Sequence, residues 1–171
     1  MKAMILAAGL GTRLRPLTDD CPKALVTISG RTLLEITLAR LRSFGIHEVI
    51  INTHHFGDLI VDYLCRHDNF GMRIAISRED VLLDTGGGLK HAAQFFLSAT
   101  GSDEPFLVHN VDVLSTIDFD RMLHFHLQHN ALATLAVQNR PTSRYLLFGD
   151  DGQLCGRRAG PDGPPDPDLT R

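Results

Sequence analysis

Short apolar runs alternate with amphipathic segments along the first 137 residues. The apolar runs have the length of strands, and the segments between them carry apolar residues at helical spacing. Strands are predicted at residues 2–8, 48–52, 72–77, 105–109 and 132–137. Helices are predicted at residues 32–44, 56–64 and 89–96, and after Asp118. The turn sequence Gly149-Asp150-Asp151-Gly152 separates two further strand-like runs and predicts a β-hairpin.

The starts of two helices carry specific signals. Thr32 followed by Glu35 is a capping box, and Gly45 is a stop signal at the other end of that helix. Asp118 is a predicted cap for a helix with Phe119 on its apolar face. The glycines at 86–88 are predicted to open the helix over 89–96.

The order of these elements predicts an α/β fold: a Rossmann-like, mostly parallel sheet with helices on both faces. Ligands of such sheets bind beyond the carboxyl ends of the strands. The loops at residues 9–23, 52–55, 79–88 and 110–116 follow strands. They should therefore line one crevice.

Composition supports a folded domain and excludes several classes. The chain has 171 residues, of which 43% are hydrophobic, and a formal net charge of −3. Nothing in this balance points to nucleic acid or an anionic membrane as a partner. Three cysteines are too few for a disulfide framework, which predicts a cytoplasmic, reduced protein. The apolar run at 3–8 is too short for a signal peptide or a membrane span.

The residues of the first loop predict a polyphosphate-binding site. Gly9 and Gly11 let the backbone approach a ligand closely, and free N–H groups there point at anionic oxygens. Arg13, Arg15 and Lys23 add positive charge. The dinucleotide fingerprint is absent, because Leu14 stands where a third glycine is needed and no acidic residue follows the second strand clearly. The Gly-Lys-Ser/Thr of a Walker loop is absent too.

Two further motifs carry candidate chemistry. Asp112 follows an apolar strand, where its carboxylate can bind Mg²⁺; a turn or helix-capping aspartate is the alternative. The three glycines at 86–88 let a flat base approach the backbone, or act as a plain hinge. Zinc is disfavoured, because the neighbouring His54 and His55 point to opposite faces.

The pattern L-A-A-G-x-G-T-R-L-x-P-L-T, followed by P-K-A-L, resembles the sugar-phosphate nucleotidylyltransferases. Small bacterial members that attach UTP or GTP to a hexose or amino-sugar 1-phosphate look most similar. The resemblance covers residues 1–157, which are predicted to form the nucleotidyltransferase domain. The proline- and aspartate-rich residues 158–171 are predicted to be a disordered or extended tail.

The resemblance implies a reaction in which an NTP and a sugar 1-phosphate give an NDP-sugar and pyrophosphate. It assigns Arg13 to the leaving phosphates, Lys23 to the α-phosphate or the incoming phosphate, Asn110 to the sugar phosphate and Asp112 to Mg²⁺. The implied nucleotide-binding residues are Leu6, Ala7, Ala8, Gly9, Gly11, Thr12, Arg13, Lys23, Asp84, Thr85, Gly86 and Gly87.

Members of the family continue with more sheet, which closes over the sugar and supplies a second metal-binding aspartate. This chain is expected to hold the nucleotide half and part of the sugar half, and Asp162, Asp166 and Asp168 do not match that aspartate. Three alternatives stay open. They are an NTP-binding module without transfer activity, a truncated product, and a cytidylyltransferase for phosphocholine or another non-sugar substrate. No oligomeric state is predicted.

Overall fold

The computed structural model describes residues 1–97, 104–161 and 163–164. The chain divides into two compact units, Met1–Ala131 and Leu132–Arg171, and each is described by itself. The predicted domain over residues 1–157 contains the first unit and residues 132–157 of the second, which include most of its hairpin.

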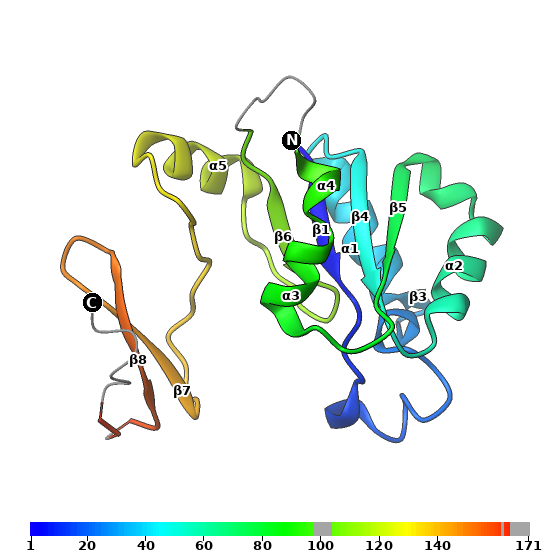
Figure 1. Ribbon diagram of the computed structural model, residues 1–171, viewed down its shortest axis with the longest axis horizontal. Helices are drawn as coiled ribbons and strands as arrows, with labels where there is room; N and C mark the ends of the chain where they lie inside the picture. The colour runs from blue at the N-terminus through cyan, green and yellow to red at the C-terminus, as the bar shows by residue number, and fades with distance from the viewer. Residues whose placement is uncertain (98–103, 162, 165–171) are drawn as a thin grey trace. The chain divides into compact units, whose positions relative to one another are not determined.

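A four-stranded parallel sheet forms the centre of the first unit (Figure 1). Its strands are β1 (Ala3–Leu6), β4 (Glu48–Thr53), β5 (Arg73–Arg78) and β6 (Leu107–Asn110), in the order β5-β4-β1-β6. In register, Leu6 lies opposite Asn52 on one side and Asn110 on the other. The parallel sheet and these four strands are confirmed.

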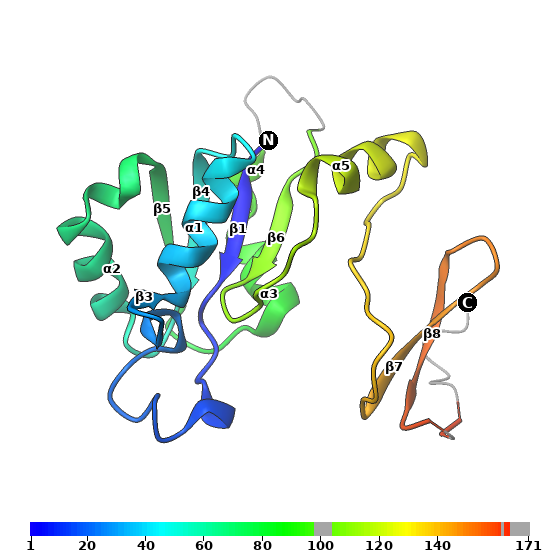
Figure 2. The ribbon, with the colours of Figure 1, turned by 180° about the vertical axis from the view of Figure 1, so that it is seen from behind.

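Helices cover both faces of this sheet, as predicted. Ile5 and its same-face neighbours pack against α1 (Leu33–Ser43), α2 (Gly57–Arg66) and the first residue of α5 (Phe119–Gln128). Met4 and Leu6 point the other way, toward Ala92 and the helices α3 (Asp84–His91) and α4 (Ala93–Phe96). Figure 1 shows α3 and α4 in front of the sheet. Figure 2, the view from the opposite side, shows α1 in front of it.

Both predicted helix caps are present. The Thr32 side chain accepts a hydrogen bond from the Glu35 N–H at 3.0 Å, and Asp118 accepts one from the Arg121 N–H at 2.9 Å. The Glu35 carboxylate bonds Arg31 at 2.7 Å. Gly45 ends α1 with a φ of 71°, a conformation that favours glycine.

Short elements complete the first unit. Three 3-10 turns lie at η1 (Thr12–Leu14), η2 (Lys23–Leu25) and η3 (Asp68–Gly71). A two-stranded ladder pairs β2 (Thr27–Ile28) with β3 (Arg31–Thr32). The first two turns lie in the loop between β1 and β2, where they place the residues of the candidate site.

Two predicted elements differ from the structure. The helix predicted over 89–96 is two helices that meet at Ala92, and α3 begins at Asp84, so the glycines lie inside it. The strand predicted over 132–137 is wrong. Its side chains Leu132, Leu135 and Val137 are exposed, and the described residues 132–137 belong to no sheet. An apolar run becomes a strand only where a neighbouring strand can pair with it.

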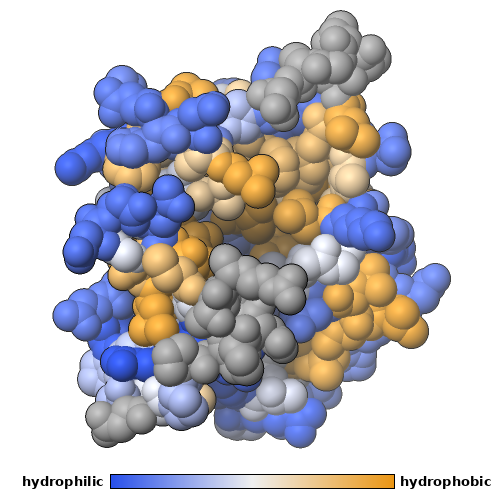
Figure 3. Space-filling model, turned by 60° about the vertical axis from the view of Figure 1, so that its left-hand side comes forward, coloured by the Kyte–Doolittle hydropathy of each residue, from blue (hydrophilic) through white to orange (hydrophobic). Residues whose placement is uncertain are grey.

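The second unit contains the predicted hairpin. Strands β7 (Arg144–Phe148) and β8 (Leu154–Ala159) pair antiparallel, with a register shift between Leu147 and Phe148. The predicted tail begins inside β8, and its positions 162 and 165–171 lie outside the described residues. Some large apolar side chains are exposed, and Figure 3 shows apolar residues in orange on one face of the surface.

No helix among the described residues is long and apolar enough to cross a membrane.

Candidate functional site

The candidate site lies at the carboxyl edge of the parallel sheet. Since β1, β4, β5 and β6 run in the same direction, the loops that follow them emerge at one edge (Figure 1). These are the loops that the sequence predicts to line a crevice. Side chains from the loops after β1 and β6 meet there, and Asn52 near the end of β4 meets Glu79 just after β5.

Gly11 gives the first loop its shape. Its φ is 67°, and a Cβ there would lie 2.9 Å from Cγ2 of Thr18. The Thr18 hydroxyl donates a hydrogen bond to the Gly11 carbonyl at 2.9 Å. Thr12 and Arg13 follow in the turn η1, where both are exposed, and Arg13 makes no ion pair with a described residue. The guanidinium of Arg13 is therefore available to an anionic ligand.

Lys23 connects the glycine loop to the end of β6. Buried Pro22 precedes the turn η2, and the Lys23 side chain lies over Gly9, with its Nζ 3.3 Å from where a Cβ of Gly9 would be. The same Nζ lies 3.5 Å from Oδ1 of Asp112. Only 13% of the Lys23 side chain is exposed, so its charge is held in one place. The structure thus brings three sequence-predicted residues together.

Asn110 lies at the edge of the sheet, as the last residue of β6, and Asp112 lies just beyond it. Asn110 ends β6 opposite Leu6, and the Val111 N–H donates to the Leu6 carbonyl at 3.2 Å. The Val113 N–H closes a turn on the Asn110 carbonyl at 3.2 Å, which presents Asp112 between them. Asn110 and Asp112 are both exposed and can contact a ligand.

Asn52 and Glu79 form a buried network on the other side of β1. The Ala7 N–H donates to Asn52 Oδ1 at 2.7 Å, and Asn52 Nδ2 donates to Glu79 Oε1 at 2.8 Å. The second carboxylate oxygen accepts from the Leu83 N–H at 3.0 Å. Sequence reasoning placed both residues in crevice loops but gave neither a role. The available signal was a polar residue at the end of an apolar strand.

The segment that the resemblance assigns to the base begins with Asp84. Asp84 has a φ of 58°, and its Oδ1 accepts from the Thr85 N–H at 2.7 Å. A Cβ at Gly87 would meet Leu83, and one at Gly88 would meet the Asn52–Glu79 network. A Cβ at Gly86 would meet nothing within 4 Å. Packing therefore explains two of the three glycines, and Gly86 faces open space beside exposed Asp84 and Thr85.

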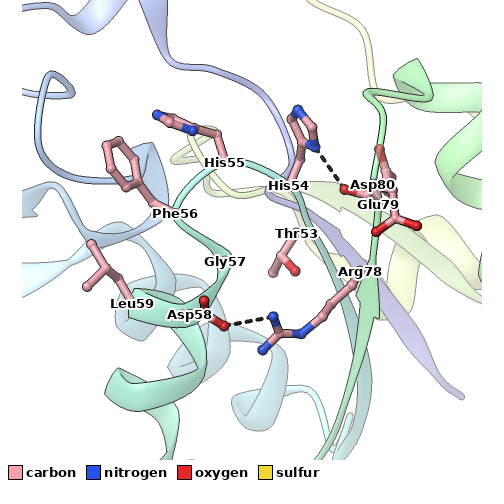
Figure 4. Close-up of a pocket in the computed structure, with 10 residues that line it drawn as sticks. All are labelled: Thr53, His54, His55, Phe56, Gly57, Asp58, Leu59, Arg78, Glu79 and Asp80. Carbon is pink, nitrogen blue, oxygen red and sulfur yellow. Dashed lines mark hydrogen bonds and ion pairs between the residues drawn. The ribbon is translucent and has the colours of Figure 1, made fainter.

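A hollow of about 510 Å³ lies next to this network (Figure 4). Figure 4 shows His54 Nδ1 bonded to the Glu79 carbonyl at 2.8 Å, and Arg78 paired with Asp58 at 2.7 Å. The hollow shares Glu79 with the network and contains no residue of the glycine loop. Its lining residues are Thr53, His54, His55, Phe56, Gly57, Asp58, Leu59, Arg78, Glu79 and Asp80. In the part of the chain that the structure describes, no three His, Cys, Asp or Glu side chains cluster as metal ligands.

His109 is a buried titratable residue close to the site. It is 8% exposed, and its ring meets that of Phe119 edge-on at 6.0 Å. Burial lowers the pKa of His109, assisted by the charge of Arg40, and outweighs the Asn110 backbone and the Asp112 charge, which act to raise it. The neutral ring is therefore favoured more strongly in the folded protein than in the unfolded chain.

This shift predicts a pH dependence of stability. An unfolded His109 takes up a proton near pH 6.5, whereas the folded one resists it, so stability is lost as pH falls from that value toward the lower folded pKa. The variant His109→Leu should therefore lose less Tm than the wild type between about pH 7.5 and about pH 5.5. Differential scanning calorimetry across this range checks it. The exposed His47→Gln is the control and should follow the wild type; equal losses in all three proteins would contradict the assignment.

The fold and these loops define an α/β protein with a glycine loop at the carboxyl edge of its parallel sheet. Residues 2–150 match the family model described as nucleotidyl transferase. The chain belongs to this nucleotidyl transferase family, and the resemblance carried by the glycine loop is confirmed.

The names of similar curated proteins describe enzymes that act on sugar phosphates. The N-acetylmuramate alpha-1-phosphate uridylyltransferase of Caulobacter vibrioides is 46% identical over 113 residues, which cover 64% of this chain and 45% of that protein. The catalytic subunit beta of mannose-1-phosphate guanylyltransferase from Danio rerio is 35% identical over 159 residues, covering 90% and 43%. The chain thus spans about half the length of the curated relatives it matches.

A solved structure supports the fold. The crystal structure of HddC from Yersinia pseudotuberculosis is similar with a TM-score of 0.73 at 22% identity. The match covers 96% of this chain and 71% of HddC.

Proposed function

We propose that this chain transfers a nucleotidyl group from an NTP to a sugar 1-phosphate, giving an NDP-sugar and pyrophosphate. The observation that carries the proposal is the position of the Lys23 ammonium group over Gly9 and 3.5 Å from Asp112. This arrangement holds one cation between the polyphosphate loop and a strand-end carboxylate. Family membership and the names of the relatives support the same reaction.

In the proposed reaction, a phosphate oxygen of the sugar 1-phosphate forms a bond to the α-phosphorus. The bond from that phosphorus to the β-phosphate bridging oxygen breaks, and pyrophosphate leaves with the electron pair. Both reactants are anions, so catalysis consists of positioning and charge neutralisation. Arg13 holds the leaving phosphates, Lys23 neutralises the α-phosphate or the incoming phosphate, and Asn110 contacts the sugar phosphate.

The nucleotide lies along the glycine loop and the segment that follows β5. Peptide N–H groups at Gly9 and Gly11 and the Thr12 hydroxyl contact its phosphates. The base lies over Asp84, Thr85, Gly86 and Gly87, where the absence of a Cβ at Gly86 leaves room. UTP and GTP are the first candidates, because the relatives are named uridylyl- and guanylyltransferases.

Asp112 is the proposed magnesium ligand. Its exposed carboxylate is a hard oxygen donor at the strand end, and Mg²⁺ is commonly bound by one or two carboxylates together with substrate phosphates. Bound there, the ion would neutralise charge on the phosphates during transfer. Because the three thiols Cys21, Cys65 and Cys155 are free, we further propose that the protein works in the reducing cytoplasm.

A pyrophosphate-release assay tests the reaction. Each of the four NTPs with Mg²⁺ is incubated with and without a panel of sugar 1-phosphates, and phosphocholine is added to the CTP arm. Release that requires both an NTP and a sugar 1-phosphate is expected. Release only with CTP and phosphocholine would identify a non-sugar cytidylyltransferase, and binding of NTP without release in any mixture would identify a binding module.

A further inference from the structure

Glu79 is a buried carboxylate that makes no ion pair with a described residue. It is 5% exposed, and each of its oxygens accepts one hydrogen bond: Oε1 from Asn52 Nδ2 and Oε2 from the Leu83 N–H. Burying a charge without a cation is unfavourable unless the hydrogen bonds it accepts are strong. A side chain that only filled this space would not need to be a carboxylate. The two hydrogen bonds that Glu79 accepts are therefore the feature to explain.

The direction of each bond in this network is fixed. A peptide N–H can only donate, so the Ala7 N–H requires Asn52 to present its Oδ1. The Asn52 amide must then turn its Nδ2 toward Glu79. Since the Leu83 N–H also only donates, both oxygens of Glu79 act as acceptors. Position 79 therefore needs two acceptors, which a carboxylate supplies.

This network joins two segments that are far apart in the chain. Ala7 is the residue after β1 that leads into Gly9, and Leu83 is the residue before Asp84. A Cβ at Gly88 would lie 2.6 Å from Glu79 Oε1 and 2.8 Å from Asn52 Nδ2, so α3 also packs directly on the network. These two side chains thus link the start of the glycine loop to the residue before α3 by three hydrogen bonds.

We propose that Asn52 and Glu79 are positioning residues that hold the phosphate-binding and base-binding segments at the spacing one nucleotide requires. This inference rests on the proposed function, because it assigns the two joined segments to the two ends of an NTP. Neither side chain contacts the nucleotide. Both act through the peptide groups of Ala7 and Leu83, which lie in or next to the two segments that do.

Single isosteric substitutions break this network in defined ways. In Glu79→Gln the side chain has one acceptor oxygen, so either Asn52 Nδ2 or the Leu83 N–H loses its partner. In Asn52→Asp an oxygen faces Glu79 Oε1 in place of Nδ2. Each single variant should raise the Kd for the best-bound NTP·Mg²⁺ by about tenfold or more, which corresponds to one buried hydrogen bond left unmade.

The double variant Asn52→Asp/Glu79→Gln should restore binding. The aspartate at position 52 accepts from the Ala7 N–H with one oxygen and from the new glutamine amide with the other. The glutamine oxygen accepts from the Leu83 N–H. All three hydrogen bonds and the single negative charge are kept, so the Kd should return to within about threefold of the wild type.

Isothermal titration of each NTP·Mg²⁺ into the wild type and the three variants measures this, with Tm recorded for all four. Tenfold losses in the single variants and recovery in the double variant support the inference. Single variants that lower Tm but keep the wild-type Kd would overturn it, because the network would then be structural only. A folded double variant that binds no better than the weaker single variant would overturn it too. If one single variant does not fold, the other single variant and the double variant decide by the same criteria.

The wild-type titration separates this inference from the proposed function. A wild-type protein that binds none of the four NTPs would contradict the proposed function itself. A wild type that binds an NTP, together with variants that fail the pattern above, would contradict only the positioning role.

Discussion

Lys23→Ala is expected to reduce nucleotidyl transfer by about 100-fold or more, because it removes a fixed cation from the place where phosphate charge must be neutralised. The Lys23 Nζ lies over Gly9 and 3.5 Å from Asp112, and only 13% of the side chain is exposed. Pyrophosphate release at saturating NTP and sugar 1-phosphate measures the effect. The proposed role of Lys23 would be contradicted by turnover within about threefold of the wild type.

Two controls separate this effect from loss of the fold. The Lys23–Asp112 pair is partly exposed, so Lys23→Ala should change Tm by at most about 4 °C. Arg73→Ala removes the same charge from the start of β5, at the opposite edge of the sheet, where Arg73 pairs with Glu48 at 2.6 Å. That variant should keep wild-type turnover.

Gly88→Ala is expected to destabilise the protein by about 1–3 kcal/mol. The added Cβ would lie 2.6 Å from Glu79 Oε1 and 2.8 Å from Asn52 Nδ2. Neither atom can move freely, because three hydrogen bonds fix the network. Urea unfolding at neutral pH measures the free energy of unfolding.

Gly86→Ala is the matched control for stability. It places the same Cβ in the same helix with nothing within 4 Å, so the free energy of unfolding should stay unchanged or rise by up to about 1 kcal/mol. Equal free energies of unfolding for Gly88→Ala and Gly86→Ala would show that the network does not restrict the space around α3.

Much of the fold could be predicted, because it follows from local patterns. The apolar runs at β1 and β4 are continuous, as strands covered on both faces must be, and the caps at Thr32 and Asp118 use local side-chain chemistry. Residues 132–137 show the limit of this reasoning. Their apolar pattern suits a strand, but strand formation depends on a partner, and a partner is not a local property.

The candidate site likewise contains residues that could be predicted from local patterns and residues that could not. Gly9, Gly11, Lys23 and Asp112 could be found because each belongs to a short motif beside a strand end. The Asn52–Glu79 pair could not, since its two residues are 27 positions apart and their contact depends on the register of β4 against β5. That register pairs Asn52 with Ser77, which places Glu79 just beyond the end of the strand.

The central claim is that one NTP lies between the glycine loop and the segment from Leu83 to Gly88. Hydrogen–deuterium exchange with and without saturating NTP·Mg²⁺ tests it most directly, because the claim concerns backbone N–H groups. We predict slower exchange in peptides covering residues 7–23, 79–88 and 110–113, and unchanged exchange across β7 and β8. Protection confined to residues 53–59 around the hollow, or no protection with any of the four NTPs, would contradict the account.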